Sequence, residues 1–355
     1  MNTYRIAVIP GDGIGQEVIP VGIRVLDAAA GRFGFGLTWE RFPWGSEYYF
    51  RHGAMMAADA LGRLQAFDAL YFGAVGHPDV PDNVTLNGLL LPIRRGFDQY
   101  ACVRPAVLHP GARSPLEGKK AGDIDLVVVR ENTEGEYAQV GGHVYVGSAD
   151  EVALQTAVFT RRGTERVMRF AFELARRRDR KRLVTSVTKS NAQGFSMAFW
   201  DRVFVEVARE FPDVRTRSLL VDAACMDLVR RPESFDVIVA SNLFGDILTD
   251  MSAMITGSLG LGASANLNPA RTHPSMFEPV HGSAPDIAGT GRANPLAAVL
   301  AGAMMLDFLG EAEASRRVEV AVAEVLEKGD TLTPDLGGSA STAEVGAAVA
   351  ERIAS

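Results

Sequence analysis

Short apolar runs alternate with longer stretches of helical periodicity along most of the chain. In residues 16–30, for example, apolar side chains recur at the three- and four-residue spacing of an amphipathic helix. Unbroken apolar strands that are separated by helices indicate a sheet covered on both faces, and hence an α/β fold. The runs that predict buried strands are residues 5–9, 69–72, 126–129, 183–187 and 237–240.

Two glycine- and proline-rich stretches interrupt this alternation. Residues 106–123 resemble a crossing between domains, and residues 257–262 could return the chain to the first domain. A length of 355 residues suits two domains or one large α/β unit. We therefore expect a discontinuous first domain of residues 1–103 plus 261–355, and a second domain of residues 104–260.

Charge and cysteine content narrow the class of protein. The chain has 36 Lys and Arg against 43 Asp and Glu, a net charge of −7. This balance argues against nucleic acid and anionic membranes as partners, because both are bound through clustered cations. Cys102 and Cys225 form neither a disulfide framework nor a zinc motif.

No apolar run has the length of a signal peptide or a membrane span. The first run meets Pro10 and Gly11 almost at once, and residues 295–309 are interrupted by Asp307 and suit a buried helix. We expect a cytoplasmic protein.

The glycines near the N-terminus allow two interpretations. Gly11, Gly13 and Gly15 follow a predicted strand and precede a predicted helix, as in dinucleotide-binding turns. The G-x-G-x-x-G spacing, however, requires glycine where Gln16 stands. A tight turn with positive φ is the simpler interpretation.

Three aspartates are candidate metal ligands. Asp246 and Asp250 are four residues apart, which places both carboxylates on one face of a predicted helix. Their mutual repulsion would be offset by Mg²⁺ or Mn²⁺, which prefer carboxylate oxygens. Asp222 follows an apolar run and is a plausible third ligand. The alternative is a solvated acidic face.

Several cations and one tyrosine lie near predicted strand ends, where α/β proteins commonly place catalytic groups. Lys189 follows one predicted strand and Arg130 ends another. Arg94 and Arg104 stand at the two ends of the segment of residues 94–104. Guanidinium groups match carboxylates, so these arginines predict a carboxylate pocket. Tyr137 beside a cation could act as a general acid. Lys189 could equally be a helix-entry lysine, and Tyr137 a packed side chain.

The motifs that these residues belong to occur together in one family. Taken together they resemble the β-decarboxylating dehydrogenases that act on (R)-2-hydroxy acids, the isocitrate/isopropylmalate dehydrogenase family, from Arg5 to about Gly338. Segments such as WGSEYY, FGAVGHPDVPD and ASANLNP look most like the D-malate and tartrate enzymes of that family. The motifs that carry the family resemblance are IPGDGIGQEV, RENTEGEY, TKSN, NLFGDILTD and MFEPVHGSAPDIAGTGRANP.

The resemblance implies two interleaved α/β domains around a mixed sheet, a fold that is not a Rossmann fold. It also implies a homodimer in which Lys189 and Asp222 reach into the partner's site. Roles are carried over residue by residue. Arg94, Arg104 and Arg130 match the carboxylate-binding arginines, Tyr137 the general acid, Lys189 the acceptor of the hydroxyl proton, and Asp222, Asp246 and Asp250 the ligands of Mn²⁺ or Mg²⁺. K⁺ is a further candidate cofactor.

The resemblance moves the expected nucleotide site away from the N-terminal glycines. An acidic residue at Asp286 suits the ribose hydroxyls of NAD and would repel the 2′-phosphate of NADP. The residues that match the family's nucleotide loop are His281, Gly282, Ser283, Ala284, Asp286 and Asn294.

The implied reaction is NAD-dependent oxidative decarboxylation of D-malate, giving pyruvate and CO₂, or of tartrate. The alternative substrate is 3-isopropylmalate, because Leu89, Leu90 and Leu91 could form an apolar wall, with Leu90 as the candidate contact. Asn87 stands where isopropylmalate enzymes usually carry an acidic residue, which favours the first assignment.

Overall fold

A computed structural model describes residues 2–355, and the chain divides into two compact units. Unit 1 contains residues 1–99, 104–124 and 252–355, and unit 2 contains residues 100–103 and 125–251. The expected boundaries at 104 and 260 therefore differ from those of the structure. Residues 104–124 belong to unit 1 because their contacts are there: the Ser114 hydroxyl donates to the Ile255 carbonyl at 2.6 Å, and Gly111 lies against Leu326.

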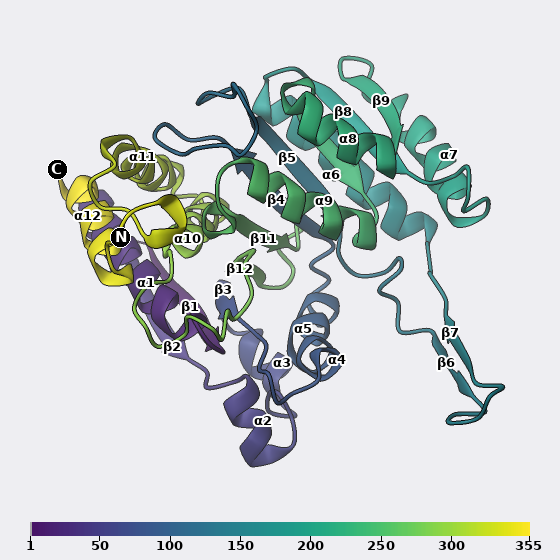
Figure 1. Ribbon diagram of the computed structural model, residues 1–355, viewed down its shortest axis with the longest axis horizontal. Helices are drawn as coiled ribbons and strands as arrows, with labels where there is room; N and C mark the ends of the chain where they lie inside the picture. The colour runs from purple at the N-terminus through teal and green to yellow at the C-terminus, as the bar shows by residue number, and fades with distance from the viewer. Residues whose placement is uncertain (1) are drawn as a thin grey trace. The chain divides into compact units, whose positions relative to one another are not determined.

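Unit 1 holds both ends of the chain and most of its helices (Figure 1). Its strands are β1 (Thr3–Gly11), β2 (Gly36–Arg41), β3 (Ala69–Ala74), β4 (Ala101–Val107, shared with unit 2), β11 (Ala263–Leu267) and β12 (Ser275–Pro279). Its helices are α1 (Gly15–Phe33), α2 (Ser46–His52), α3 (Ala60–Leu64), α4 (Asp82–Thr85), α5 (Leu91–Gly96), α10 (Leu296–Leu309), α11 (Ala312–Lys328) and α12 (Thr342–Ala354). A π-helical turn, Leu86–Leu90, joins α4 to α5, and two short 3₁₀ turns lie at Leu259–Leu261 and Pro334–Leu336.

The strands of unit 1 follow the order β2-β1-β3-β12-β11-β4. Strands β1, β2, β3 and β12 pair in parallel, whereas β11 pairs with β12 in the antiparallel sense, so the sheet is mixed. Every residue of β3 and β12 is buried, as expected for inner strands covered on both faces.

Helices α1, α10 and α12 pack closely because small residues stand at their contacts (Figure 1). A Cβ atom at Gly302 of α10 would lie 2.6 Å from the Leu26 side chain of α1. A Cβ atom at Gly346 of α12 would lie 2.1 Å from the Val21 side chain. Helix α10 is buried along most of its length, as predicted for residues 295–309.

Unit 2 is built on a parallel sheet with the strand order β5-β10-β8-β9. Its strands are β5 (Asp125–Glu131), β8 (Leu183–Thr188), β9 (Arg215–Leu220) and β10 (Val237–Ala240). Its helices are α6 (Arg161–Arg178), α7 (Ser196–Ala208), α8 (Val221–Arg230) and α9 (Asn242–Ile255, whose end from Ser252 belongs to unit 1), with a 3₁₀ turn at Pro232–Ser234. Helix α6 packs against β5, β8 and β10, and Trp200 of α7 donates to the Ser186 hydroxyl of β8 at 2.9 Å.

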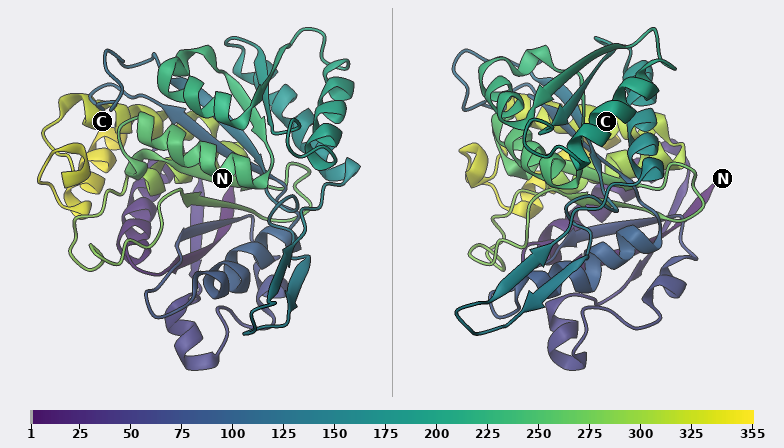
Figure 2. Two further views of the ribbon diagram at one scale, coloured as in Figure 1. Left: turned by 45° about the vertical axis from the view of Figure 1, so that its right-hand side comes forward. Right: turned by 90° about the vertical axis from the view of Figure 1, so that its right-hand side faces the viewer.

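A separate antiparallel hairpin, β6 (Gly141–Val144) with β7 (Val152–Gln155), belongs to unit 2. It extends away from the other strands and helices of that unit (Figures 1 and 2). All eight of its strand residues are exposed, and its apolar side chains include Tyr145 in the turn, which is 68% exposed. The hairpin therefore leaves apolar side chains without a packing partner within the described chain.

The predicted elements are confirmed where the sequence was most regular. The five predicted strands lie within β1, β3, β5, β8 and β10, and the helix predicted at residues 16–30 lies within α1. Gly11 and Gly13 have φ of 69° and 52°, which confirms the tight-turn interpretation of the N-terminal glycines. None of the helices in residues 2–355 is long and apolar enough to cross a membrane. Cys102 and Cys225 are both free thiols.

Candidate functional site

Helix α9 carries two of the candidate metal ligands, and a carboxylate fixes its first turn. Glu136 accepts a hydrogen bond from the Ser241 hydroxyl at 2.7 Å and another from the Leu243 N–H at 3.1 Å. A carboxylate at this end of a helix also interacts favourably with the helix dipole. The loop that follows β5 thus sets the position of α9.

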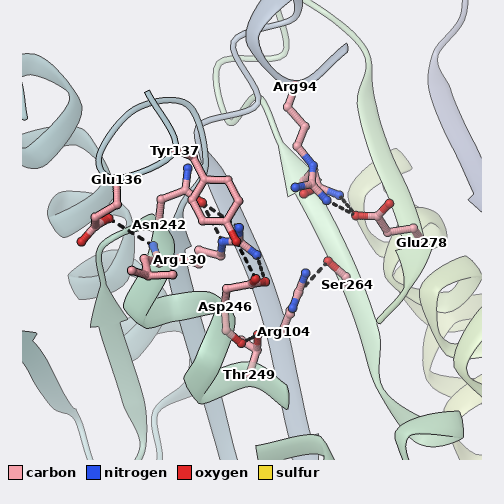
Figure 3. A network of polar contacts seen from close by, with 12 residues as sticks. Arg94, Arg104, Arg130, Glu136, Tyr137, Asn242, Asp246, Thr249, Ser264 and Glu278 are labelled. Carbon is pink, nitrogen blue, oxygen red and sulfur yellow. Dashed lines mark hydrogen bonds and ion pairs between the residues drawn. The ribbon is translucent and has the colours of Figure 1, made fainter. Parts of the chain in front are cut away.

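Arg130, at the end of β5, is the centre of the polar cluster in unit 2 (Figure 3). Its Nε and Nη2 atoms donate to Asn242 Oδ1 at 2.9 and 2.7 Å, and its Nη1 atom donates to Asp246 Oδ1. The close approach depends on Gly245, because a Cβ atom there would lie 2.6 Å from the Arg130 side chain. The sequence places glycine where α9 meets the arginine.

Tyr137 joins the same cluster from the loop after β5. Its hydroxyl donates to Asp246 Oδ2 at 2.8 Å, and the centre of its ring lies 5.1 Å from the Arg130 guanidinium carbon. Asp246 thus accepts from the arginine at one oxygen and from the tyrosine at the other (Figure 3). Asp250 lies one turn further along α9 and is exposed. Four of the predicted site residues therefore lie on or beside the first turns of α9.

Lys189 and Asp222 form a second pair in unit 2. Lys189 follows β8, Asp222 lies in the first turn of α8, and the lysine ammonium donates to the aspartate Oδ1. This hydrogen bond holds the pKa of the Asp222 carboxyl below its ordinary value. Within residues 2–355, no group of three or more metal-binding side chains gathers at one point. Asp222, Asp246 and Asp250 of one chain therefore do not form a three-ligand site by themselves.

Arg94 and Glu278 form a buried ion pair in unit 1 (Figure 3). Arg94 Nη2 donates to Glu278 Oε1 at 2.7 Å, and Asn266 Nδ2 donates to the same oxygen at 2.7 Å. The two charged side chains are 5% and 6% exposed. Helix α5, strand β12 and strand β11 each supply one member, so the position of Arg94 is fixed by three elements.

Arg104 and Leu90 complete the predicted substrate residues. Arg104 is buried, and its Nε atom donates to the Ser264 hydroxyl of β11 at 3.3 Å (Figure 3). Leu90 is partly buried against the hydrophobic core, whereas Leu89 and Leu91 are fully buried. Of the three leucines of the expected wall, Leu90 alone is therefore partly exposed, and Leu89 and Leu91 are buried.

The predicted nucleotide residues lie in the loop between β12 and α10. His281, Ser283 and Asn294 are buried, whereas Gly282 and Asp286 are exposed and Ala284 has a left-handed φ of 42°. Asn294 Nδ2 donates to Asp335 Oδ2 at 2.9 Å. The loop thus presents the exposed carboxylate of Asp286 between the buried residues Ser283 and Asn294.

His281 has one nitrogen without a hydrogen-bond partner among the described residues. Its Nδ1 atom lies 3.0 Å from the Gly282 carbonyl, while its buried Nε2 atom has none. Burial lowers the pKa of the ring, so the neutral form is favoured. A neutral ring with an unsatisfied nitrogen suits a polar ligand atom, because a buried polar group without a partner is destabilising.

The sequence did not single out several residues that support the site. Asn242 and Glu278 stood inside recognised motifs, so their presence was visible but their bonds to Arg130 and Arg94 were not. Glu136 stands in the RENTEGEY motif next to Tyr137 and carried no signal of its own. Asn266 and Ser264 lie in the ASANLNP segment and carried no other signal.

Comparisons with known proteins agree with this geometry. A model of the family described as isocitrate/isopropylmalate dehydrogenase matches residues 5–349. The chain is 54% identical over 360 residues to D-malate dehydrogenase [decarboxylating] of Escherichia coli (strain K12), covering 99% of each chain. It is 53% identical to a probable tartrate dehydrogenase/decarboxylase of Agrobacterium vitis, covering 100% of this chain and 99% of that one.

A solved structure extends the likeness to the fold. The crystal structure of isocitrate dehydrogenase from Methylococcus capsulatus superposes with a TM-score of 0.90 and 38% identity, covering 99% of this chain and 100% of that one. The isocitrate dehydrogenase-like α/β fold with a large mixed sheet is thereby confirmed. The chain belongs to the isocitrate/isopropylmalate dehydrogenase family of oxidoreductases.

Proposed function

We propose that this enzyme catalyses the NAD-dependent oxidative decarboxylation of an (R)-2-hydroxy dicarboxylic acid, D-malate or tartrate, with a divalent metal. The observation that carries the proposal is the shared engagement of Asp246 by Arg130 and Tyr137. This contact joins a carboxylate-binding cation, a proton donor and a candidate metal ligand. The relatives named for D-malate and tartrate support the substrate class.

The arginines would bind the two carboxylates of the substrate. Arg94, Arg104 and Arg130 are buried, and hydrogen bonds to Glu278, Ser264 and Asn242 hold their guanidinium groups in place. Buried guanidinium groups that are fixed in advance bind carboxylates with little reorganisation. These three arginines are therefore proposed to bind the carboxylates of a malate-type substrate.

A divalent cation suits the carboxylates of α9. Asp246 and Asp250 offer hard oxygen donors one helical turn apart, the donor type that Mn²⁺ and Mg²⁺ prefer. When bound, the ion would supply Lewis-acid polarisation of the substrate's oxygen atoms. Asp222 is proposed to complete the ligand set from a second copy of the chain.

Two side chains are placed to move protons. The Lys189 side chain is 29% exposed beside Asp222, and in its neutral amine form it is proposed to accept the proton of the 2-hydroxyl as hydride leaves C2. The Tyr137 hydroxyl already donates to Asp246 and is proposed to deliver a proton to C3 after CO₂ departs.

The loop of residues 281–294 is proposed to hold NAD. The unsatisfied Nε2 atom of His281 is available to a base of the nucleotide, and the exposed Asp286 carboxylate can accept from ribose hydroxyls. The negative charge of Asp286 would repel a 2′-phosphate. NAD is therefore expected to be preferred over NADP.

The proposed partner is a second copy of the chain. The β6–β7 hairpin exposes apolar side chains, and Met226 and Val229 of α8 are exposed near Asp222 in the sequence. Exposed apolar side chains of this kind are commonly buried in an interface with another protein chain, also where the protein carries a net charge such as the −7 found here. A homodimer would cover both features and bring Asp222 and Lys189 to the partner's site.

A side-by-side assay tests the proposed function. Formation of NADH is followed with D-malate, the tartrate isomers, 3-isopropylmalate and isocitrate, in the presence of Mn²⁺ and K⁺. We expect the highest kcat/KM with D-malate or tartrate, and a higher value with NAD than with NADP. The absence of turnover with every 2-hydroxy diacid would contradict the proposal, and a preference for NADP would contradict the role of Asp286.

The second candidate substrate is 3-isopropylmalate. The partly buried Leu90, near Arg94 on the adjoining helix, is the observation that favours it, because an apolar side chain suits an alkyl group at C3. A kcat/KM for 3-isopropylmalate above that for D-malate would select this alternative.

A further inference from the structure

We propose that Glu17 is a positioning residue that holds the nucleotide loop, and Asp286 with it, in the conformation that binds NAD. The inference rests on the NAD site proposed above and assigns a role to a residue of another element. Glu17 lies in the first turn of α1, more than 260 residues before the loop in the sequence. All of the residues involved belong to unit 1.

The Glu17 carboxylate binds the backbone of the loop with both of its oxygens. Oε1 accepts a hydrogen bond from the Gly289 N–H at 2.5 Å, and Oε2 accepts one from the Gly291 N–H at 2.8 Å. Hydrogen bonds to an ionised acceptor are stronger than neutral ones, and two parallel bonds also fix orientation. Glu17 thus holds the second half of the loop from one side, while the Thr342 N–H donates to the Gly291 carbonyl at 2.8 Å.

The loop itself has little regular structure to hold it. Gly289 and Gly291 have φ of 78° and 68°, and a Cβ atom at either would meet nothing within 4 Å. Glycine is therefore required at these positions for the backbone conformation and not for space. Glycine has the largest backbone freedom of all residues, so this part of the loop is stabilised most by groups that hold it from outside.

A second anchor from the same helix end holds the start of the loop. The Ile14 N–H donates to the Ser283 carbonyl at 2.8 Å, and a Cβ atom at Gly13 would lie 2.0 Å from that carbonyl oxygen. Asp286 stands between this anchor and the two bonds to Glu17. The segment that carries the proposed ribose-binding carboxylate is thus held on both sides by the N-terminal end of α1 and its N-cap residue Ile14.

This arrangement has a consequence for affinity and for selectivity. A loop that is ordered before the nucleotide arrives loses less conformational entropy on binding. The discrimination against NADP likewise requires that the Asp286 carboxylate keep its place near the 2′-position. Loss of Glu17 is therefore expected to weaken the binding of NAD and to narrow the preference for NAD over NADP, while the distant chemical groups keep their geometry.

Two variants of Glu17 and one control test the role. Glu17→Ala removes both bonds, and Glu17→Gln keeps a single acceptor oxygen. The control Asp68→Ala removes an exposed carboxylate of unit 1 that accepts the Arg5 N–H at 2.7 Å. KM for NAD is expected to rise about tenfold or more in Glu17→Ala and by less in Glu17→Gln, while kcat and KM for D-malate change by less than about twofold.

Two measurements without turnover complete the test. The Kd of NADH, from its fluorescence, should rise in the same order as KM for NAD. Amide hydrogen exchange in residues 284–293 should be faster in both Glu17 variants than in the wild type and in Asp68→Ala, before any nucleotide is added. Glu17→Gln carries the test by itself if Glu17→Ala does not fold.

The outcomes separate this inference from the proposed function. If the wild type reduces NAD with D-malate but Glu17→Gln has unchanged KM and unchanged exchange, the positioning role is wrong. A parallel loss of kcat, of KM for D-malate and of thermal stability would instead show a general structural role and would also overturn the inference. If the wild type neither binds NADH nor turns over, the proposed function itself fails.

Discussion

Two buried arginines, one in each unit, bind an acidic partner, but the partners differ in exposure. Arg94 in unit 1 pairs with Glu278, and these side chains are 5% and 6% exposed. Arg130 in unit 2 is 2% exposed, whereas its partner Asp246 is 35% exposed. The Glu278 carboxylate is therefore enclosed, whereas the Asp246 carboxylate is partly open to solvent.

The difference indicates different tasks for the two carboxylates. Glu278 receives Arg94 and Asn266 at one oxygen within the interior, so it fixes a cation and has little access to a ligand. Asp246 receives Arg130 and Tyr137 and still reaches solvent, so it can exchange partners when a substrate or metal arrives. The comparison predicts that changes at Asp246 act mainly on kcat, whereas changes at Glu278 act mainly on stability and reach substrate binding only through Arg94.

The largest expected effect is the loss of turnover in Asp246→Asn and in Lys189→Met. Each removes a group proposed to act at the reacting atoms, so kcat should fall by about 10³-fold or more. Size-exclusion chromatography should show an unchanged assembly, because neither change removes an apolar contact. Near-normal rates in either variant would contradict the assigned role.

Mixing the two inactive variants sharpens this prediction. If Lys189 serves the partner's site, a mixed dimer contains one site with both changes and one site with neither. Subunit exchange between Lys189→Met and Asp246→Asn should then restore up to about a quarter of wild-type activity. No recovery in a verified mixed dimer would show that each chain builds its own site.

The sequence predicted best where a strand is an unbroken apolar run; the equally buried β12 contains Ser275 and Glu278 and was not predicted. Inner strands such as β3 and β10 are unbroken apolar runs because both of their faces are covered. The end strands β2 and β9 have polar and exposed residues, and the β6–β7 hairpin is exposed throughout, so none of them produced a clear signal.

The site could be predicted as residue types but not as contacts. Arg130 and Asp246 are 116 residues apart in sequence, and Arg94 and Glu278 are 184 apart. Only the folded sheet brings such residues together, because strand order is not written in local periodicity. The three leucines at 89–91 show the opposite case, because they are identical neighbours in sequence but differ in the fold. Leu89 and Leu91 are buried in the core, and Leu90 is partly exposed.

A smaller effect than the loss of turnover is expected for the stability of unit 1. Glu278→Ala leaves the buried Arg94 charge without its ionic partner and should lower the free energy of unfolding by about 3–5 kcal/mol. Asp246→Ala should cost less, about 1–2 kcal/mol, because its partner Arg130 keeps Asn242 and the site is partly solvated. Urea unfolding of both variants measures the difference. Equal losses would remove the distinction between an enclosed and an open carboxylate.

The smallest expected effect is the dependence of the free energy of unfolding on pH, which is also expected to differ between the two sites. The cluster of Arg130, Tyr137, Asn242 and Asp246 contains no histidine, whereas the nucleotide loop of unit 1 contains the buried His281. Burial lowers the pKa of His281 from the ordinary value of 6.5, so the unfolded chain takes up this proton first as pH falls. The stability that the neutral ring contributes is present above pH 6.5 and is lost as pH falls toward the lowered pKa. The wild type should therefore lose stability relative to His281→Asn as pH falls below 6.5, as urea unfolding at a series of pH values would show. A difference between the two proteins that stays constant with pH would mean that His281 keeps the same pKa in the folded and unfolded states.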